Sequence, residues 1–507
     1  MIRKILAMVL GFIIIIPVIL ADESQTIYVI RELEFEVDGI SRPYYLALYG
    51  DFKEGERIEG RENLERYIER RIQTLNNQRV LDYTATRIEY FLGTPEADGA
   101  LPVRLLIFVK DTPWNFVVVP YPKYDSNSGL SISLRAREYN FLGTMNPLRI
   151  DLGFASDQDD KQSVNFMIDT NTPFQAFGYN WVFNFDHFLE YTFDEDLYYR
   201  NITGVSMNLP WNNTSFTFGL NHFITLNHSD YKDVFGSIDP YIRWGIPLGI
   251  QVWDYGHLYY SMGVSGIINY PYDLLPESLR PNAVFSHSLG FGRVDWIGNY
   301  RKGLSASLSN SFTWYFDRSD APLATNLEAV VTFFHPFNKL IGVYSRLRYR
   351  HYWRWSDRND KWLHFDDGGN VLRGVLNKDL HGLNMLSLNL DIPIRVLRFW
   401  PSEWLEDPEV SMFNFEMHFS PFMDIALAEG PYYSHSSLPN KEIKFGLDQM
   451  ITTIGLEIIV YPHIARSLTI RGSLGYNVEK LMERGYQPRF GFVPQWDEIY
   501  IGLDFHF

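Results

Sequence analysis

The segment that decides the fold is Asp497-Glu498-Ile499-Tyr500-Ile501-Gly502-Leu503-Asp504-Phe505-His506-Phe507. From Ile499 onward every second residue is apolar, and most of the residues between them are polar. Side chains alternate between the two faces of a strand, so the pattern predicts a strand with one apolar face and one polar face. Soluble sheets and membrane barrels both contain such strands, and the rest of the chain must distinguish them.

Composition and charge exclude several classes of protein. The chain of 507 residues has no cysteine, so it has no disulfide framework, no thiolate metal site and no cysteine nucleophile. Its formal charge of −16 argues against nucleic acid as a partner. Aromatic residues make up 16% of the chain, as girdles of Tyr, Trp and Phe at two membrane interfaces would require. The length allows either several soluble domains or one large barrel.

The N-terminal segment Met1–Ala21 has the pattern of a signal peptide. Arg3 and Lys4 give a positive start, an apolar run covers Ile5–Leu20, and Ala21 provides a small residue for cleavage. A retained anchor helix is the alternative. No later stretch is long and apolar enough for a membrane helix. The sequence therefore predicts export, either to the periplasm or to the outer membrane.

Residues 22–112 predict a small α+β domain with the order strand, helix, helix, strand, strand. Leu64, Ile68, Ile72 and Leu75 recur at spacings of three and four, which predicts a helix over Arg61–Gln78. A shorter helix and three strands are predicted at Pro43–Gly50, Ile27–Val37, Leu81–Leu92 and Leu101–Lys110. A short sheet of this kind has an edge that can accept an extended segment of another chain as an added strand.

Residues 113–507 predict β-structure throughout. In Leu304–Trp314, serines and a threonine alternate with mostly apolar residues. In a barrel the polar face would line the lumen and the apolar face would meet lipid, whereas in a soluble sandwich the polar face would meet water outside. Arg346, Arg348 and Arg350 share one face of the next clear strand and predict a basic stripe in the lumen.

The length of this region predicts about 16 strands, at roughly 24 residues per strand and loop. The alternating runs suggest a somewhat higher number, because Asp239–Tyr272 has the pattern of an additional hairpin. We interpret this hairpin as an insertion within a loop. The fold class predicted is thus a transmembrane antiparallel β-barrel of residues 113–507, preceded by the α+β domain.

Three motifs follow one another in the predicted barrel. The turn Asn140-Phe141-Leu142-Gly143-Thr144 comes after the second predicted strand. Val371-Leu372-Arg373-Gly374 follows a long polar loop and precedes a strand that ends at Asp391. Phe422-Met423-Asp424 lies in the strand after that one. An Arg-Gly pair alone is common, so the order and spacing of the motifs carry the information.

This order resembles the BamA/TamA superfamily of outer-membrane assembly factors. In that superfamily an Arg-Gly loop folds back into the lumen and its Arg meets the Asp of a Phe-x-Asp strand. The resemblance implies that Arg373 and Gly374 lie at the tip of such a loop, that Asp424 and Asp391 bind the guanidinium, and that five strands follow. It also implies that Asn140, Phe141 and Gly143 form the turn that follows the second barrel strand in this family.

The two ends of the chain resemble parts of the same proteins. Tyr500, Gly502, Phe505 and Phe507 match the C-terminal assembly signal of bacterial outer-membrane proteins, in which the last strand closes the wall. The N-terminal order of elements resembles a POTRA domain, the periplasmic module of the superfamily. Some features depart from the family: Val375 replaces an aromatic residue, Asp391 replaces Glu, and one POTRA-like unit stands where the essential assembly factors carry several. The last departure argues against a central assembly role.

The resemblance implies an outer-membrane protein that inserts or exports other proteins. Its partners would be lipid, unfolded or exported client proteins, and periplasmic accessory proteins. A passive porin-like channel and a two-partner secretion transporter are the alternatives; the second usually carries two POTRA units and a plugging N-terminal helix. No nucleophile elbow, His-Glu-x-x-His helix or phosphate loop occurs, so we predict no enzyme, metal site or cofactor. An enzyme built from lumen-facing acids is the remaining alternative.

Overall fold

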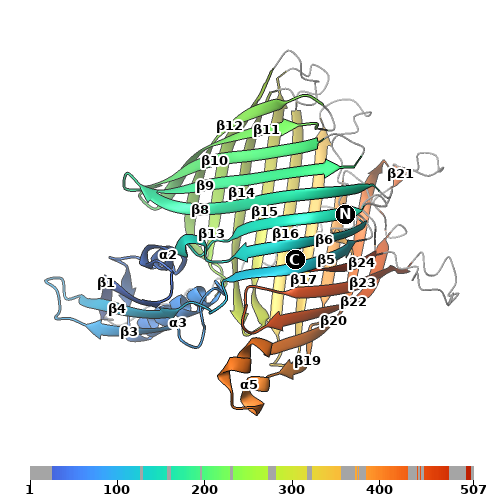
Figure 1. Ribbon diagram of the computed structural model, residues 1–507. Coiled ribbons are helices and arrows are strands. Elements are labelled where there is room, and N and C mark those ends of the chain that lie inside the picture. Colours follow the sequence, from blue (N-terminus) through green and yellow to red (C-terminus); the bar gives the residue numbers. More distant parts are fainter. Residues whose placement is uncertain are drawn as a thin grey trace.

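The computed structural model contains a small α+β domain joined to a large β-barrel (Figure 1). The residues that the structure describes are 26–125, 129–156, 161–193, 197–228, 232–271, 281–316, 323–354, 371–373, 375, 384–431, 442–443, 446, 450–478 and 498–503. The predicted signal peptide Met1–Ala21 lies outside them, as do Gly374, Phe505 and Phe507.

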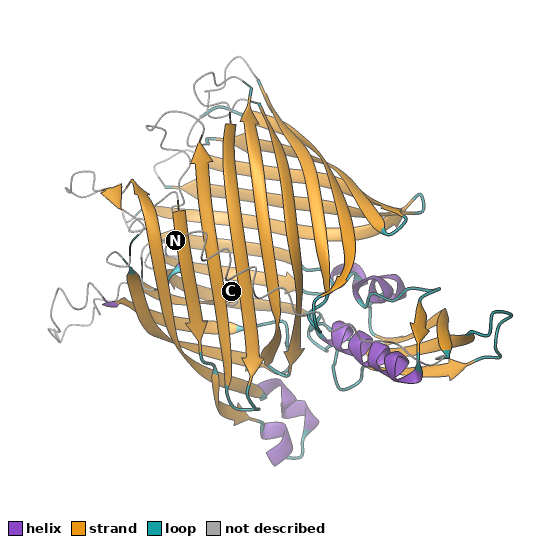
Figure 2. Ribbon diagram, turned by 180° about the vertical axis from the view of Figure 1, so that it is seen from behind, coloured by secondary structure: helices purple, strands orange, loops and turns teal. Residues whose placement is uncertain are grey.

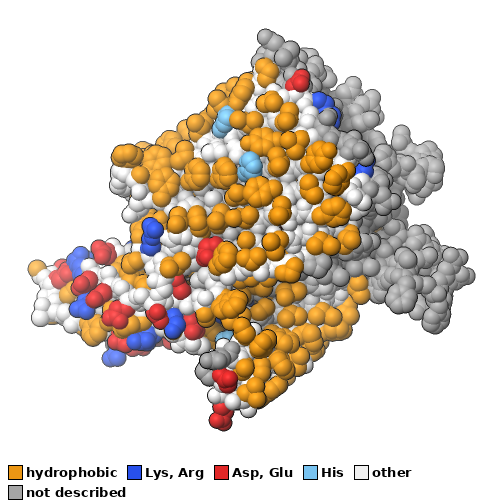
Figure 3. Space-filling model, viewed as in Figure 1, with side chains coloured by type: hydrophobic (Ala, Val, Ile, Leu, Met, Phe, Trp, Pro, Cys, Tyr) orange, Lys and Arg blue, Asp and Glu red, His pale blue; other side chains and the backbone are white. Residues whose placement is uncertain are grey.

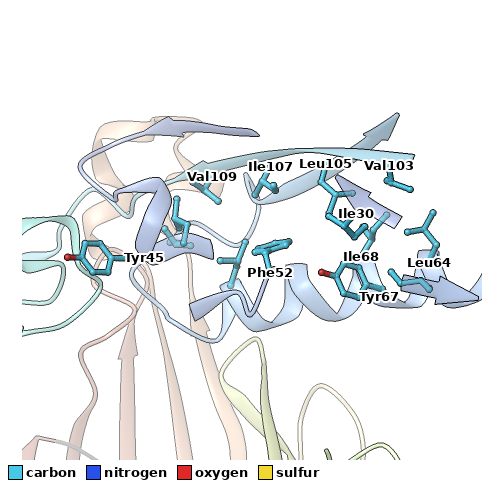
Figure 4. Close-up of a cluster of buried hydrophobic side chains, with 14 of the residues drawn as sticks. Ile30, Tyr45, Phe52, Leu64, Tyr67, Ile68, Val103, Leu105, Ile107 and Val109 are labelled. Carbon is cyan, nitrogen blue, oxygen red and sulfur yellow. The ribbon is translucent and has the colours of Figure 1, made fainter. Parts of the chain in front are cut away.

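The N-terminal domain is a four-stranded sheet in the order β2-β1-β4-β3 that packs against two helices. The predicted order of elements is present, with the short β2 as an additional edge strand. Residues from α3 and every second residue of β4 fill the core between the sheet and the helices (Figure 4). The elements are β1 (Ile27–Asp38), α2 (Pro43–Tyr49), β2 (Arg57–Glu59), α3 (Arg61–Asn76), β3 (Arg87–Leu92) and β4 (Leu101–Lys110).

The rest of the described chain forms a closed antiparallel barrel in which the last strand meets the first. β18 and β19 share one place in the wall, as do β21 and β22, so the twenty described strands fill eighteen places. The strands are β5 (Phe116–Asp125), β6 (Gly129–Glu138), β7 (Leu148–Ser156), β8 (Gln162–Ala176), β9 (Tyr179–Thr192), β10 (Leu197–Trp211), β11 (Thr214–Leu226), β12 (Phe235–Gln251), β13 (His257–Tyr270), β14 (Asn282–Ile297), β15 (Tyr300–Tyr315), β16 (Leu323–Pro336), β17 (Gly342–Arg354), β18 (Asn384–Asp391), β19 (Ile394–Phe399), β20 (Phe415–Pro431), β21 (Glu442–Ile443), β22 (Ile451–Pro462), β23 (Ile470–Asn477) and β24 (Glu498–Leu503).

The fold class is confirmed, but two details of the prediction need correction. The strand number is higher than the expected value of about 16. The predicted insertion at Asp239–Tyr272 is wrong, because β12 and β13 pair with β11 and β14 along the wall. Short turns are the physical reason: Phe177 and Gly178 join β8 to β9 with φ of 55° and 78°, which makes a tight hairpin. With such short turns, each strand and its loop take fewer residues than the roughly 24 from which the expected number of strands was obtained.

The wall has an apolar outside and a polar inside. In β15, Leu308 is half exposed on the outer face, whereas Ser305 hydrogen-bonds to Thr332 of β16, with 2.5 Å between the hydroxyl oxygens. Figure 3 shows hydrophobic side chains over the outside of the wall and charged side chains gathered on the N-terminal domain. A closed sheet with such an outer face leaves no unpaired edge in lipid, so the barrel is of the transmembrane type.

Among the described helices, none is both long and apolar enough to cross a membrane.

The barrel has two different ends. At the domain end, the N-terminal domain lies against several turns; at the other end, many connections lie outside the described residues (Figures 1 and 2). Between β19 and β20 the chain forms α5 (Pro401–Trp404) and the 3-10 turn η5 (Pro408–Phe413). Together with the adjoining parts of β19 and β20, they project from the wall at the domain end (Figure 2). We call residues 394–419 the protrusion.

Candidate functional site

The candidate site is built around Arg373, which belongs to the connection between β17 and β18 and lies inside the barrel. Its side chain is 2% exposed. Nε and Nη2 donate to the two carboxylate oxygens of Asp424 at 3.0 and 2.7 Å, and the backbone N–H of Arg373 donates to the same carboxylate at 2.9 Å. This is the two-pronged geometry that a planar guanidinium makes with a carboxylate. Because Asp424 belongs to β20 and is fully buried, the connection is fixed to the inside of the wall.

Two more carboxylates and an aromatic ring complete the surroundings of the guanidinium. Nη1 donates to Asp391 of β18 at 2.6 Å and to Glu457 of β22 at 3.3 Å. The ring of Phe422, two residues before Asp424, lies 3.6 Å from the guanidinium carbon. A cation buried in this way is stable only when carboxylates and hydrogen bonds replace its water. We call Arg373, Asp391, Asp424 and Glu457 the lumen lock.

Neighbouring groups hold the backbone of the same connection. The side-chain N–H of Asn389 donates to the carbonyl of Val371 at 2.7 Å, and Asn389 accepts from Nε of Arg346 at 3.2 Å. Val371 and Leu372 are fully buried in a cluster that includes Met385 of β18. The connection is therefore held by both apolar packing and ionic contacts.

The predicted basic stripe lies inside the barrel, next to the lumen lock. Nε of Arg348 and Nε of Arg350 both donate to Glu328 of β16, at 2.5 and 3.0 Å. Arg346 reaches the lock through Asn389. The stripe is thus a paired, structural set of charges that ties β17 to β16 and β18.

The sequence motifs identified three of the four lock residues. The structure brings Arg373, Asp391 and Asp424 together, while Gly374 lies outside the described residues. Glu457 was missed. It is the one charged residue of the described strand Ile451–Pro462, and this single acid in an apolar strand was the available signal.

The closing seam of the barrel joins β24 to β5. In the described residues the seam pairs Tyr500 with Asp125 and Ile501 with Tyr124. On its other side, β24 pairs with β23 along its whole described length, from Glu498 to Leu503.

β5, the strand on the other side of the seam, contains two prolines. Pro120 and Pro122 lie in the middle of this strand and have no N–H to donate. Proline inside a sheet is found mainly in edge strands and at bulges. β5 therefore has the composition of an edge strand, although it closes the barrel.

Two of the four residues of the predicted C-terminal signal can be placed. Tyr500 and Gly502 lie in β24, opposite Ser473 and Arg471 of β23. Phe505 and Phe507 lie outside the described residues. The described residues of this segment thus lie in the strand that closes the barrel, where the sequence analysis expected them.

The early barrel turn contacts the N-terminal domain directly. Asn140 is fully buried, and its side-chain N–H groups donate to the Ser41 hydroxyl at 2.8 Å and to the Asp111 carboxylate at 3.1 Å. Its side-chain oxygen accepts from the backbone N–H of Met145 at 2.8 Å. Asp111 also accepts from the backbone N–H groups of Ile40 and Ser41 at 2.8 and 3.1 Å. We call this set of contacts the joint.

The glycine of the same turn is required by its position. The turn forms the 3-10 element η1 (Phe141–Gly143), and Gly143 has a φ of 72°. A Cβ at Gly143 would lie 2.0 Å from the carbonyl oxygen of Ile40. The Gly143 carbonyl accepts from the backbone N–H of Arg42 at 3.1 Å. Only glycine fits this approach without strain. Phe141 opens the element, and its carbonyl accepts from Thr144.

Other turns of the domain end also hold the N-terminal domain. Arg79 donates from Nε to the carbonyl of Arg466 at 2.5 Å and lies over the ring of Trp296 at 4.2 Å. Burial, and secondarily the charge of Arg466, lower the pKa of Arg79 to about 10. Asn77 exchanges two hydrogen bonds with Asp295 and Trp296 at the end of β14, and the Tyr45 hydroxyl donates to the carbonyl of Pro173 at 2.7 Å. The domain is therefore docked across several turns of the barrel mouth.

These features define the class of the protein: a large transmembrane β-barrel with an α+β domain docked at one end and a buried ionic lock in its lumen. Neither a scan against protein-family models nor a search of curated proteins finds a match.

Solved structures similar to this chain include BamA from Haemophilus ducreyi lacking POTRA domains 1-3, with 13% identity and a TM-score of 0.40 over 94% of this chain and 84% of that one. CdiB from Acinetobacter baumannii has 13% identity and a TM-score of 0.45 over 94% and 74%. CdiB from Escherichia coli has 10% identity and a TM-score of 0.40 over 96% and 92%. At these values the likeness concerns the fold alone.

Proposed function

We propose that this chain is a bacterial outer-membrane barrel of the BamA/TamA type that inserts or exports proteins. Residues 22–112 are then its single POTRA-like domain, on the periplasmic side. The order of the sequence motifs supports this proposal, since Arg373, Asp391 and Asp424 form the contact that the resemblance implies. The α+β domain directly ahead of the barrel is a second support.

The contact of Arg373 with Asp391 and Asp424 carries the proposal, and the junction of the first and last strands is the place that the proposal assigns to a client strand. β24 pairs with β23 from Glu498 to Leu503, and it meets β5 at the described pairs Tyr500–Asp125 and Ile501–Tyr124. Opening a seam exposes backbone N–H and C=O groups, which is costly in lipid unless another strand pairs with them. A client strand that pairs with the exposed edge can supply hydrogen-bond partners for these N–H and C=O groups. The junction of the first and last strands is therefore the place where we expect a client strand to enter.

The N-terminal domain would act before the seam. Its edge strand β3 pairs with β4 on one side, and Phe91 and Leu92 at its end are about half exposed. An extended client segment could pair with this edge and be held near the barrel mouth. The joint fixes the domain close to β6 and β7, the strands that follow β5 in the wall.

A passive channel is the alternative from another class. A wide, permanently open pore requires neither the buried Arg373–Asp424 contact nor a domain joined to the barrel through Asn140. Conductance of the purified protein in planar bilayers distinguishes the two functions. A large and constantly open conductance would favour the channel.

The test of the proposal is crosslinking at the seam in living cells. A photoreactive amino acid replaces Ile501 or Tyr124, and Leu308 on the lipid face of β15 is the matched control position. We expect newly exported proteins to be trapped at both seam positions and not at Leu308. Equal trapping at all three positions, or none at the seam, would contradict the proposal.

A further inference from the structure

The protrusion continues the wall past the neighbouring turn. Ile341, next to the start of β17, forms a bridge with Ile394, but β19 runs on to Phe399. β20 pairs with β19 and with β22 down to Phe415, which lies opposite Phe399 and Pro462. Figure 1 shows α5 and the ends of these strands below the rest of the wall, at the domain end. This part of the sheet reaches further than its neighbours on the β17 side.

The tip of the protrusion is firmly built. Asn414 is 3% exposed, donates to the Ser402 hydroxyl at 2.7 Å, and accepts from the backbone N–H of His463 at 2.8 Å through its carbonyl. The rings of His463 and Trp400 lie 5.4 Å apart. Arg398 makes two hydrogen bonds with Glu403, at 3.0 and 2.6 Å. These contacts join α5, β19, β20 and the turn after β22 into one fixed shape.

This fixed shape displays large apolar side chains. Trp404 is 64% exposed, Leu405 65%, Met412 43% and Phe413 59%. Contiguous apolar surface of this kind is rarely left in water by a soluble protein and marks a binding surface. The acidic residues Glu403 and Glu406 lie next to Trp404 and Leu405 in the chain, so the tip is amphipathic.

The apolar surface of the tip adjoins the lipid-facing wall. Leu397 and Phe419 are exposed on the outer face of β19 and β20, and Ile458 lies opposite Phe419 on the outer face of β22. Figure 3 shows hydrophobic side chains running from the wall down onto the protrusion, with acidic groups at its lowest point. Apolar side chains therefore lead from the lipid-facing wall toward the tip, and the exposed Arg398–Glu403 ion pair also lies in this part of the protrusion.

We propose that the protrusion is a membrane-interface element whose apolar tip inserts into the lipid leaflet at the domain end of the barrel. Trp404, Leu405, Met412 and Phe413 occupy the boundary between headgroups and acyl chains, where a Trp ring is favoured because it has an apolar body and one N–H donor. Glu403 and Glu406 remain on the water side. The proposal rests on the transmembrane fold and is independent of any client protein.

A lipid surface fits these observations better than a protein partner. A protein would have to cover a patch that adjoins the lipid-covered wall. Lipid already covers the outer faces of β19, β20 and β22, and extends to the tip without any additional binding partner. The protrusion includes the start of β20, which lies two places from β23 and three places from β24 in the wall. It would therefore hold this side of the wall at a fixed depth.

The absence of cysteine from the chain allows a direct test. Leu405→Cys, Met412→Cys and Phe413→Cys are each spin-labelled in the full-length barrel, reconstituted in phospholipid nanodiscs. Leu308→Cys on the wall is the lipid control, and Phe91→Cys on β3 is the water control. Slow gel migration before heating identifies any variant that has not folded. Because three tip positions are labelled, the test remains possible if one of these variants does not fold.

The measurement is the accessibility of each label to oxygen, which partitions into lipid, and to a water-soluble nickel chelate. We expect the oxygen-to-nickel ratio at the tip to be several-fold higher than at Phe91 and close to the value at Leu308. Ratios equal to that at Phe91 would overturn the proposal, since the tip would then lie in water and be free for a protein partner. Low accessibility to both reagents would also overturn it, because the tip would be buried against protein.

Discussion

β20 and β24 both belong to the C-terminal part of the barrel, but they occupy different places in the wall. β20 pairs along its length with β18 and β19 on one side and with β22 on the other, and the lumen lock adds the Arg373–Asp424 contact from inside. β24 pairs with β23 from Glu498 to Leu503 and closes the barrel against β5. The comparison teaches that the ionic brace and the closing junction are at different places in the wall. β22 and β23 lie between β20 and β24, and β22 contributes Glu457 to the lock.

The largest expected effect is loss of the brace. Arg373→Ala removes the guanidinium that Asp424, Asp391 and Glu457 surround, and leaves these carboxylates buried with reduced compensation. Breaking a buried pair on one side costs about 3–5 kcal/mol. We expect a clear fall in the temperature at which the folded barrel loses its fast migration on gels, together with reduced activity.

A double variant sharpens this prediction. Asp424→Ala should destabilise the barrel to a similar degree, and Arg373→Ala with Asp424→Ala should be little worse than either alone, because residues in contact do not act additively. The measurement is the same melting series on gels. Fully additive losses, or an Arg373→Ala barrel with unchanged heat resistance, would mean that the lock does not brace the wall.

The second effect concerns the joint, which uses neutral donors where the lock uses a cation. Asn140→Ala leaves the buried Asp111 carboxylate without one of its donors and should weaken docking of the N-terminal domain by about 1–3 kcal/mol. Heat resistance of the barrel itself should change little. Limited proteolysis between domain and barrel should become faster.

Gly143→Ala is the matched variant for the joint. Its Cβ would lie 2.0 Å from the Ile40 carbonyl oxygen, so the turn or the domain must move. Proteolysis should accelerate at least as much as for Asn140→Ala. If both variants release the domain no faster than the unchanged protein, the joint is not what holds the domain in place.

A smaller effect is expected inside the lock itself. Glu457→Gln keeps the size of the side chain and removes one of three carboxylates around a single guanidinium, and its contact with Arg373 is the longest of the set at 3.3 Å. Arg471 lies 3.6 Å from the same carboxylate. The loss in unfolding free energy should stay well below that of Arg373→Ala, because Asp391 and Asp424 still surround the guanidinium. A loss as large as that of Arg373→Ala would place Glu457 at the centre of the brace.

The smallest effect on the finished barrel is expected at the C-terminus. Deletion of Phe507 removes one residue of the predicted assembly signal, a small part of a large wall. Assembly in cells should slow, while the melting temperature of the assembled barrel should hardly change. Pulse-labelling of newly made protein measures the first quantity. A normal assembly rate would show that the segment is not a signal.

Strand alternation made most of the fold predictable, because lipid outside and water inside require opposite faces of each strand to differ. The places where prediction failed depend on turns and register. The hairpin around Asp239–Tyr272 was misplaced because sequence does not show how tightly strands such as β8 and β9 are joined. The order of three motifs was enough to bring Arg373, Asp391 and Asp424 together.

The remaining site residues could not be predicted because their partners are distant in the chain. Asn140 was identified as part of a turn, but its partner Ser41 lies 99 residues away in another domain. Glu457 is 84 residues from Arg373, and its inward direction depends on the register of β22 with β20. Such contacts follow from the closed wall and the docked domain rather than from any local pattern.

The most direct test of the central claim is a disulfide across the seam. Tyr124→Cys with Ile501→Cys joins β5 to β24 at a register pair, and Tyr124→Cys with Leu130→Cys joins β5 to β6 as the matched control. With the seam bond oxidised, we predict loss of client insertion or export and its recovery on reduction, while the control bond leaves activity unchanged. Full activity with the seam bond closed would contradict the account.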